Sequence, residues 1–183
     1  MLINDRYDVI TIGAGHAGCE AALAAARMGA RTLMICLYLD SIAMMPCNPS
    51  IGGPAKGHMV REIDALGGEC ASAADSATRH LRWLNTSKGA AVRTLRAQCS
   101  PRRYSDHYRT ALLTEKNIAL HQAQAADLII EHGEARGVKI KTGQVFYADC
   151  VILATGTYLD SKIHIGMTSH KSGPLGMVAS TEF

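Results

Sequence analysis

Three groups of residues in this sequence combine types and spacing suited to chemistry: a glycine-rich turn, a cysteine in a loop of prolines and glycines, and a block of arginines. The turn, Gly13-Ala14-Gly15-His16-Ala17-Gly18, has the Gly-x-Gly-x-x-Gly spacing of dinucleotide-binding sites. In such turns the first glycine permits a tight bend, the second lets the backbone approach a pyrophosphate, and the third lets a helix pack on a strand. The helix that follows offers amide N–H groups and a positive dipole end to the same pyrophosphate.

These glycines alone do not distinguish FAD from NAD. An acidic residue about 20 positions further on normally binds the ribose, but residues 33–38 contain no acid and the first one is Asp40. Either Asp40 reaches back or the ribose is held in another way. A later turn, Thr155-Gly156, follows the apolar residues 151–154. Many flavoproteins with two dinucleotide domains return the chain to the cofactor at such a strand end, although a simple strand–turn junction has the same pattern.

Cys47 lies in residues 44–54, a loop rich in proline and glycine whose amide N–H groups could stabilise a thiolate. A buried, inert cysteine is the other interpretation, and the residue types alone do not decide between the two. Cys36 and Cys150 are expected on buried strands. The six cysteines include no Cys-x-x-Cys pair, which argues against a zinc site and against a disulfide framework. No metal site is predicted.

A basic block lies between Arg79 and Arg109, where eight lysines and arginines are accompanied by one acid, Asp106. The whole chain carries a net charge of only +3, so the remainder is slightly acidic. Such a block suits a polyanion, but a solvated surface gives the same pattern.

The segments around the glycines predict an α/β fold. Residues 7–12 and 31–37 are apolar runs typical of strands, and residues 19–28 between them are strong helix formers. Three prolines and repeated glycines predict irregular structure over residues 38–57. Two more helices are expected, over residues 58–66 and after Ser100-Pro101, the second burying Tyr104, Tyr108, Ala111 and Leu112. Further strands are expected at residues 78–84, 118–122, 128–131, 137–141, 145–147 and 149–154.

The overall composition is that of a globular protein. At 183 residues, with 48% hydrophobic and 19% charged residues, the chain is expected to form one domain. It has no run of eighteen apolar residues and no signal-peptide pattern at its start, so the expected location is the cytoplasm.

Distinctive blocks occur along nearly the whole chain. The glycine turn contains an unusual histidine, His16. Further blocks are Cys47-Asn48-Pro49-Ser50-Ile51-Gly52-Gly53, Lys56-Gly57-His58, residues 62–68, Leu84-Asn85, Ser87-Lys88-Gly89, Ala91-Val92-Arg93, Arg96-Ala97-Gln98, Gly156-Thr157 and residues 163–166. Together these blocks resemble the N-terminal part of the MnmG (GidA) family, which modifies the wobble uridine of tRNA. The chain departs from the family pattern at Ala14, where glycine is usual, at Ala90, where proline is usual, and over residues 36–38 and 172–177, so it resembles a divergent or truncated member.

The resemblance implies a Rossmann-like FAD/NAD(P)-binding fold of the glutathione-reductase type, with a central parallel sheet and a small antiparallel β-meander. Residues 1–183 are then a partial FAD-binding domain, without the family's inserted NADH-binding domain and C-terminal helical domain. The resemblance implies that FAD contacts residues 13–18 with Thr155 and Gly156. Ala125 and Ser180 match positions that line the flavin site in the family.

The resemblance also implies a function: modification of C5 of the wobble uridine, with NADH and methylenetetrahydrofolate as co-substrates. An MnmE-like GTPase is the implied partner, and the full-length family is expected to form homodimers. Cys47 is the implied catalytic thiol. The basic block resembles a tRNA-facing surface, with Arg93, Arg96, Arg102 and Arg103 as candidate RNA contacts. This chain alone is expected to be inactive.

Two other functions remain open. A non-catalytic flavin- or RNA-binding module is one alternative. The related folate-dependent tRNA methyltransferase is the other, although its sequences lack the extended Cys-Asn-Pro and Ser-Lys-Gly blocks seen here. A generic NADH oxidoreductase is the weakest reading, because no second dinucleotide fingerprint occurs.

Overall fold

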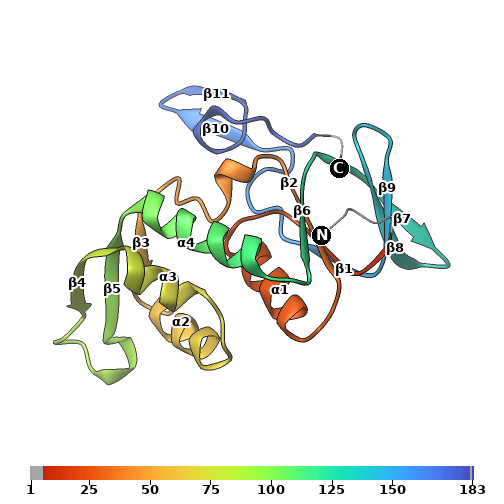
Figure 1. Ribbon diagram of the computed structural model, residues 1–183. Coiled ribbons are helices and arrows are strands. Elements are labelled where there is room, and N and C mark those ends of the chain that lie inside the picture. The colour runs from red at the N-terminus through yellow and green to blue at the C-terminus, as the bar shows by residue number, and fades with distance from the viewer. Residues whose placement is uncertain (1–5, 182) are drawn as a thin grey trace. The chain divides into compact units, whose positions relative to one another are not determined.

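Figure 1 shows a computed structural model of the chain, which describes residues 6–181 and 183. The chain forms two compact units. The first unit contains the described residues up to Ile42 and those from Leu112 onward, and the second contains residues 43–111. The second unit is therefore inserted into the sequence of the first.

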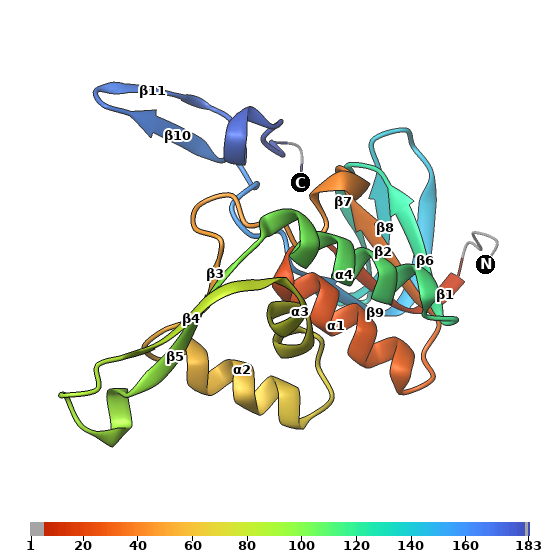
Figure 2. The same ribbon diagram turned by 60° about the vertical axis from the view of Figure 1, so that its left-hand side comes forward.

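The first unit is built on a six-stranded sheet with the strand order β6-β2-β1-β9-β8-β7. The strands β6, β2, β1 and β9 run parallel, whereas β7 and β8 form an antiparallel meander with β9. The predicted Rossmann-like fold with a parallel sheet and a small meander is thus confirmed (Figure 2). Its elements are β1 (Arg6–Ile12), α1 (His16–Arg27), β2 (Thr32–Cys36), η1 (Leu39–Ser41), β6 (Ile118–Gln122), β7 (Ala125–Glu131), β8 (Glu134–Ile140) and β9 (Val145–Leu153).

Strand β9 joins the parallel and antiparallel parts of this sheet. Its first three residues pair with β8, and it runs parallel to β1 from Tyr147 to Leu153. The prediction of two separate strands here is wrong, because Ala148, the residue left between them, is a buried position within one continuous strand. The Asp149 carboxylate forms an ion pair with Arg6, 3.1 Å away.

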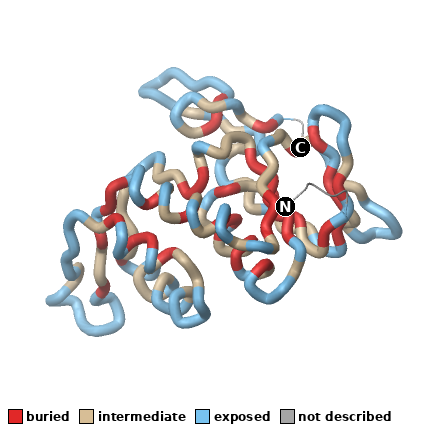
Figure 3. The backbone as a smooth tube through the Cα atoms, viewed as in Figure 1, coloured by how far each residue is buried: buried red, intermediate tan, exposed pale blue. Residues whose placement is uncertain are grey.

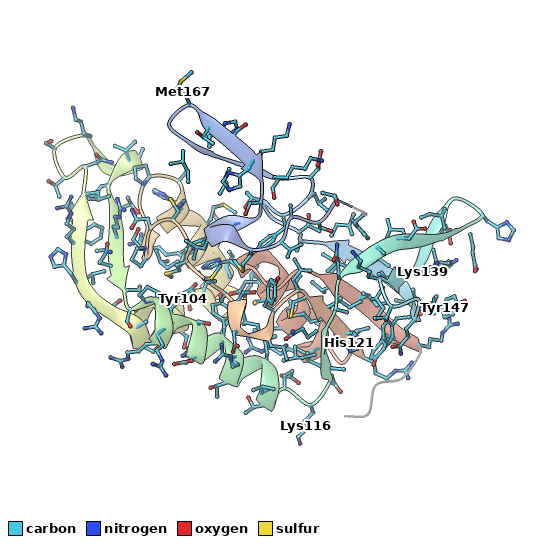
Figure 4. All side chains as sticks on the ribbon, turned by 90° about the horizontal axis from the view of Figure 1, so that it is seen from above. Tyr104, Lys116, His121, Lys139, Tyr147 and Met167 are labelled. Carbon is cyan, nitrogen blue, oxygen red and sulfur yellow. The ribbon has the colours of Figure 1, made fainter. Side chains whose placement is uncertain are left out.

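The core of the first unit lies in its sheet, where buried positions follow one another along the strands (Figure 3). Tyr7 and Ile10 of β1 cluster with Leu33 of β2 and with Phe146 of β9. The ring of His121, labelled in Figure 4, meets Phe146 edge-on at a centroid distance of 5.2 Å. These residues come from different strands, so burying them together stabilises the observed order of strands in the sheet.

The first unit ends in a small hairpin, β10 (Lys162–Ile165) and β11 (Thr168–Lys171), followed by η3 (Pro174–Gly176). Met167 lies at the hairpin tip and points away from the chain in Figure 4. No helix in the described part of the chain has both the length and the apolar character needed to span a bilayer.

The second unit contains an antiparallel sheet with the order β3-β5-β4. The predicted strand over residues 78–84 is confirmed as β4, and the predicted helix face is confirmed in α4, where Tyr104, Tyr108 and Leu112 are buried. The two tyrosine rings lie 5.3 Å apart. The elements are β3 (Ser50–Gly52), α2 (Lys56–Ala65), α3 (Cys70–Ala77), β4 (Thr78–Leu84), η2 (Ala90–Val92), β5 (Thr94–Cys99) and α4 (Pro101–Thr114), of which α4 crosses into the first unit's residues.

Four of these elements, β3, α3, η2 and β5, go beyond the sequence prediction. The prediction of irregular structure over residues 38–57 is wrong in three places, where the chain forms η1, β3 and the first turn of α2. Strand β3 exists because it pairs with β5, from Ser50 opposite Gln98 to Gly52 opposite Arg96. A three-residue strand is too short to show an alternating pattern, and its pairing partner is distant in sequence, so no local signal predicts it.

Candidate functional site

The turn between β1 and α1 runs directly against the end of β9. The Gly13 amide donates to the carbonyl of Ile35, 2.8 Å away, and the Ala154 amide donates to the carbonyl of Ile12, also 2.8 Å away. Gly13 has a φ of +108°, and a Cβ there would overlap the carbonyl oxygen of Ala154. Only glycine fits this position.

Gly18 is required for a second close approach, whereas Gly15 is not. A Cβ at Gly18 would overlap the Gly13 carbonyl oxygen, so Gly18 lets the first turn of α1 lie on the bend. A Cβ at Gly15 would meet nothing within 4 Å, and its φ of −73° suits any residue. Gly13 and Gly18 are therefore explained by packing within the protein, but the absence of a side chain at Gly15 is not.

Helix α1 begins at this open position. Gly15 is its N-cap, and within the described residues the first turn has no side-chain cap hydrogen bond and no acidic residue. The positive end of the helix dipole is therefore not neutralised by a carboxylate of the turn itself. Gly15 and Ala17 are exposed, and Ala14 is buried, accepting a hydrogen bond from Cys19 Sγ on its carbonyl at 3.3 Å. Open space at a helix N-terminus suits an anionic group.

The other predicted cofactor residues lie in different parts of the first unit. Thr155 follows the strand end that contacts Gly13, and the exposed Gly156 has a φ of +59°. Ala125 begins β7 and is buried in the core cluster. Ser180 is buried in the C-terminal loop, where its amide donates to the Tyr158 carbonyl at 2.8 Å. The structure thus brings Thr155 to the turn and explains Ala125 by core packing.

The segment that follows β2 contains no acidic residue before Asp40. Tyr38 follows this strand, and the Leu39 amide donates to the side-chain oxygen of Gln122 at 3.2 Å. Burial raises the pKa of Tyr158, and the neighbouring Tyr38 raises it further. Asp40 is exposed in η1. Gln122 ends β6, the neighbour of β2 in the sheet, so its place beside Leu39 follows from the strand order and has no local signal in the sequence.

Cys47 belongs to the second unit, in the segment that leads into β3. Its side chain is exposed, as an accessible thiol requires. The segment is tied to the sheet by the Pro49 carbonyl, which accepts from the Cys99 amide at 2.7 Å. Within the described ranges no hydrogen bond ends on the Cys47 sulfur.

The other cysteines divide between the two predictions made for them. Cys36 is buried as predicted, and desolvation raises the pKa of its thiol to about 11. Cys150 is exposed, so the prediction of a buried Cys150 is wrong. Among the described strands, β9 has β8 beside it only over residues 145–147, which leaves Cys150 with a strand neighbour on one side.

The basic block divides into sheet arginines and helix arginines. Arg82 of β4 lies directly opposite Arg96 of β5, and Arg96 Nε donates to Ser50 Oγ at 3.2 Å. The Arg93 guanidinium lies over the Trp83 ring, 4.8 Å from its centroid. These arginines lie in or beside the sheet, whereas Arg102, Arg103 and Arg109 lie on α4.

The helix arginines have acidic neighbours. Arg102 and Arg109 both approach the Asp106 carboxylate, at 3.9 Å and 3.3 Å. Arg103 lines an open cavity of about 470 Å³ between α3 and α4, together with Glu69 and His107. His107 Nε2 and Glu69 Oε1 are 2.6 Å apart. In the part of the chain that the structure describes, no group of three or more His, Cys, Asp or Glu side chains is placed to hold a metal ion.

Comparison with known proteins identifies related chains. The sequence model of the family described as "Glucose inhibited division protein A" matches residues 8–183. The tRNA uridine 5-carboxymethylaminomethyl modification enzyme MnmG of Alkaliphilus metalliredigens is 56% identical over 174 residues, which are 95% of this chain and 28% of that protein. MnmG of Desulfitobacterium hafniense is 56% identical over 171 residues, 93% of this chain and 27% of that protein. The chain thus spans less than a third of the length of the curated relatives it matches.

Solved structures agree with this match. Aquifex aeolicus GidA superposes with a TM-score of 0.92 at 43% identity, over 98% of this chain and 30% of that one. The GidA-related protein from Thermus thermophilus has a TM-score of 0.69 at 21% identity, over 96% of this chain and 64% of that one. This second likeness is evidence for the fold alone.

Proposed function

Because the chain belongs to the glucose inhibited division protein A (GidA) family, we propose that it is the FAD-binding part of an enzyme that modifies C5 of the wobble uridine in tRNA. The names of its relatives support the reaction. The open space at Gly15, which packing within the protein does not explain, is the observation that carries the cofactor assignment.

The proposed cofactor site uses the turn as a pyrophosphate cradle. Gly13 and Gly18 hold the bend against the end of β9. Gly15 leaves room for a phosphate, and the start of α1 directs its dipole and the amides of residues 15–18 toward that space. Thr155 and Gly156 extend the site along the adjacent strand end, and Ala125 and Ser180 are proposed flavin-site positions on family resemblance. Bound FAD would supply electron transfer.

The proposed reaction uses further participants that the family resemblance supports. Cys47 is the proposed thiol nucleophile, and its exposed side chain supports that role. NADH and methylenetetrahydrofolate are the proposed reductant and one-carbon donor. An MnmE-like GTPase and tRNA are the proposed partners of the full-length enzyme, acting as a homodimer in the cytoplasm. Arg93, Arg96, Arg102 and Arg103 are the proposed RNA contacts.

The cofactor assignment is tested by filling the open space. Gly15→Ser keeps a good N-cap residue and places a side chain where the protein itself leaves room. Calorimetric titration should show FAD binding to the unaltered chain more tightly than NADH, and at least tenfold weaker FAD binding to the variant, about 1.4 kcal/mol. Ala24→Ser, on the exposed side of the same helix, is the matched control and should bind FAD normally.

Two results would contradict the proposal. Tighter binding of NADH would overturn the choice of FAD. Unchanged FAD affinity in Gly15→Ser, with the variant folded by circular dichroism, would show that the pyrophosphate does not lie at this turn.

A further inference from the structure

The edge of the sheet in the second unit carries positive charge that no described acidic residue neutralises. The strands β3, β4 and β5 contain no acidic residue. Arg82 and Arg96 face each other across β4 and β5, and like charges in directly opposed positions destabilise a sheet. The described residues give this pair one hydrogen bond, from Arg96 to the uncharged Ser50 hydroxyl, and no carboxylate. Because the two guanidinium groups repel each other in the folded protein, an anion from outside the chain would stabilise the pair.

An aromatic ring lies beside this pair. Trp83 follows Arg82 in β4, and the residue is 45% exposed although tryptophan has the largest side chain. The guanidiniums of Arg93 and Arg61 lie 4.8 Å and 6.0 Å from its ring centroid. Cations over an exposed indole make a surface on which a nucleobase stacks, because both the ring and the guanidinium planes stack bases.

The position of β4 at the sheet edge determines what kind of ligand fits. Consecutive strand residues point to opposite faces, so Arg82 and Trp83 lie on different faces of β4. A ligand contacts both only by passing around the edge, and residues 79–83 of this edge strand are all exposed. A rigid duplex cannot follow that path, whereas a single strand can place its phosphates toward Arg82 and Arg96 and turn a base onto Trp83.

The arginines on α4, unlike Arg82 and Arg96, lie close to a carboxylate. Arg102 and Arg109 share the Asp106 carboxylate, so part of their charge is compensated within the helix. Their surface lacks an exposed tryptophan, since Trp83 is the only one in the chain. Arg109, which is not among the proposed RNA contacts, therefore serves as an internal control.

We propose that the β4 edge, with Arg82, Arg96 and Trp83, binds an unpaired segment of RNA by phosphate contacts on one face and base stacking on the other. This inference rests on the proposed tRNA function, and it adds Arg82 and Trp83 to the predicted RNA contacts. It assigns the sheet arginines, rather than those of α4, to the principal contact.

The single tryptophan makes a direct test possible. The 183-residue protein is titrated with a single-stranded oligoribonucleotide, a blunt RNA duplex, heparin and tRNA while tryptophan fluorescence and binding are recorded. Single-stranded RNA and tRNA should quench Trp83 fluorescence. Heparin, which has charge but no bases, should bind without comparable quenching, and the duplex should bind more weakly than the single strand.

Matched variants separate the two groups of arginines. Arg82→Gln and Arg96→Gln should each weaken single-stranded RNA binding about five- to tenfold and reduce the log–log salt slope by about 0.7. Arg109→Gln, on α4 and paired with Asp106, should leave both nearly unchanged. Trp83→Phe should retain most of the affinity and Trp83→Leu should lose it, with circular dichroism verifying that every variant is folded.

The outcomes distinguish this inference from the function on which it rests. If tRNA binds but Trp83 fluorescence is unchanged and Arg82→Gln binds normally, the edge-strand site is overturned while the tRNA function stands. Equal quenching by heparin also overturns base stacking. If the protein binds no RNA, the inference is wrong, and the proposed function is then judged by FAD binding at Gly15.

Discussion

The glycine turn of the first unit and the basic sheet of the second unit are both proposed to meet phosphates, yet they are prepared for them differently. In the turn, backbone contacts account for Gly13 and Gly18 and leave Gly15 as the position that packing does not explain. In the sheet, the unexplained feature is charge, because Arg82 faces Arg96 and the described residues place no carboxylate in an ion pair with either. Shape marks one site and uncompensated charge marks the other.

The arginines beside the two sheets differ as well. In the first unit Arg31 is paired with Asp8 and Arg6 with Asp149. Cations that have partners in the folded chain contribute to its stability, whereas opposed cations reduce it until a ligand neutralises them. The turn should therefore respond to steric changes and the sheet to charge and salt.

The largest expected effect comes from adding a methyl group at the turn. Gly13→Ala combines a φ of +108° with overlap of the Ala154 carbonyl oxygen, so unfolding free energy should fall by about 3–5 kcal/mol, measured by urea denaturation. Gly143→Ala is the matched control, because its φ of +94° is similar but its Cβ would meet nothing within 4 Å. It should cost only about 1–2 kcal/mol. Equal losses would show that overlap at the turn adds nothing.

The two sites also differ in how far the sequence predicts them. The turn depends on neighbours within one motif, so the Gly-x-Gly-x-x-Gly spacing predicts both its bend and its helix. The packing of Gly13 against Ala154 brings together positions distant in sequence, yet the apolar run before Thr155 already indicated a strand end.

The sheet was less predictable for a physical reason. Residues 78–84 were predicted as a strand, but β5 and β3 were not, so the register that places Arg82 opposite Arg96 could not be derived. The count of basic residues identified the block, but it could not distinguish the arginines of the sheet from those of the helix. Pairing distant in sequence, rather than local propensity, determines that separation.

Each unit has one exposed cysteine, so thiol reactivity can be compared between the two units. Cys47 in the second unit and Cys150 in the first are exposed, whereas Cys36 is buried with a pKa raised to about 11. At pH 8 only about one Cys36 thiol in a thousand would be ionised, so iodoacetamide should label both exposed cysteines at least a hundredfold faster. Peptide mass spectrometry gives the rates. If Cys47 is the nucleophile it should also exceed Cys150 several-fold, and equal rates would remove the support that reactivity lends to that role.

A smaller effect is expected at the compensated ion pair of the first unit. The Asp8 carboxylate accepts from the Arg31 amide at 2.6 Å and faces its guanidinium at 3.4 Å, and these contacts, the amide bond first, lower the Asp8 pKa below its usual 3.8. A lowered pKa stabilises the fold above pH 3.8 and loses that contribution as the pH falls through the folded-state value. Asp8→Asn should therefore cost about 0.5 kcal/mol at pH 7 and nothing near pH 2. Asp149→Asn, at the more exposed pair with Arg6, should cost less, and a pH-independent loss at Asp8 would argue for a packing role.

The smallest effect has the opposite sign and belongs to the sheet. Arg82→Gln removes one of two directly opposed cations, so without RNA it should stabilise the protein by about 0.3 kcal/mol in dilute buffer. Added salt screens the repulsion in the unaltered protein, so the gain should shrink as ionic strength rises toward 1 M. Arg79→Gln is the control, because no residue is registered opposite Arg79 at the irregularity between Thr78 and His80. Urea titrations at several salt concentrations provide the measurement. A variant less stable than the unaltered protein would mean that Arg82 has a favourable partner in the folded chain, and the charge on this edge would then need no external anion.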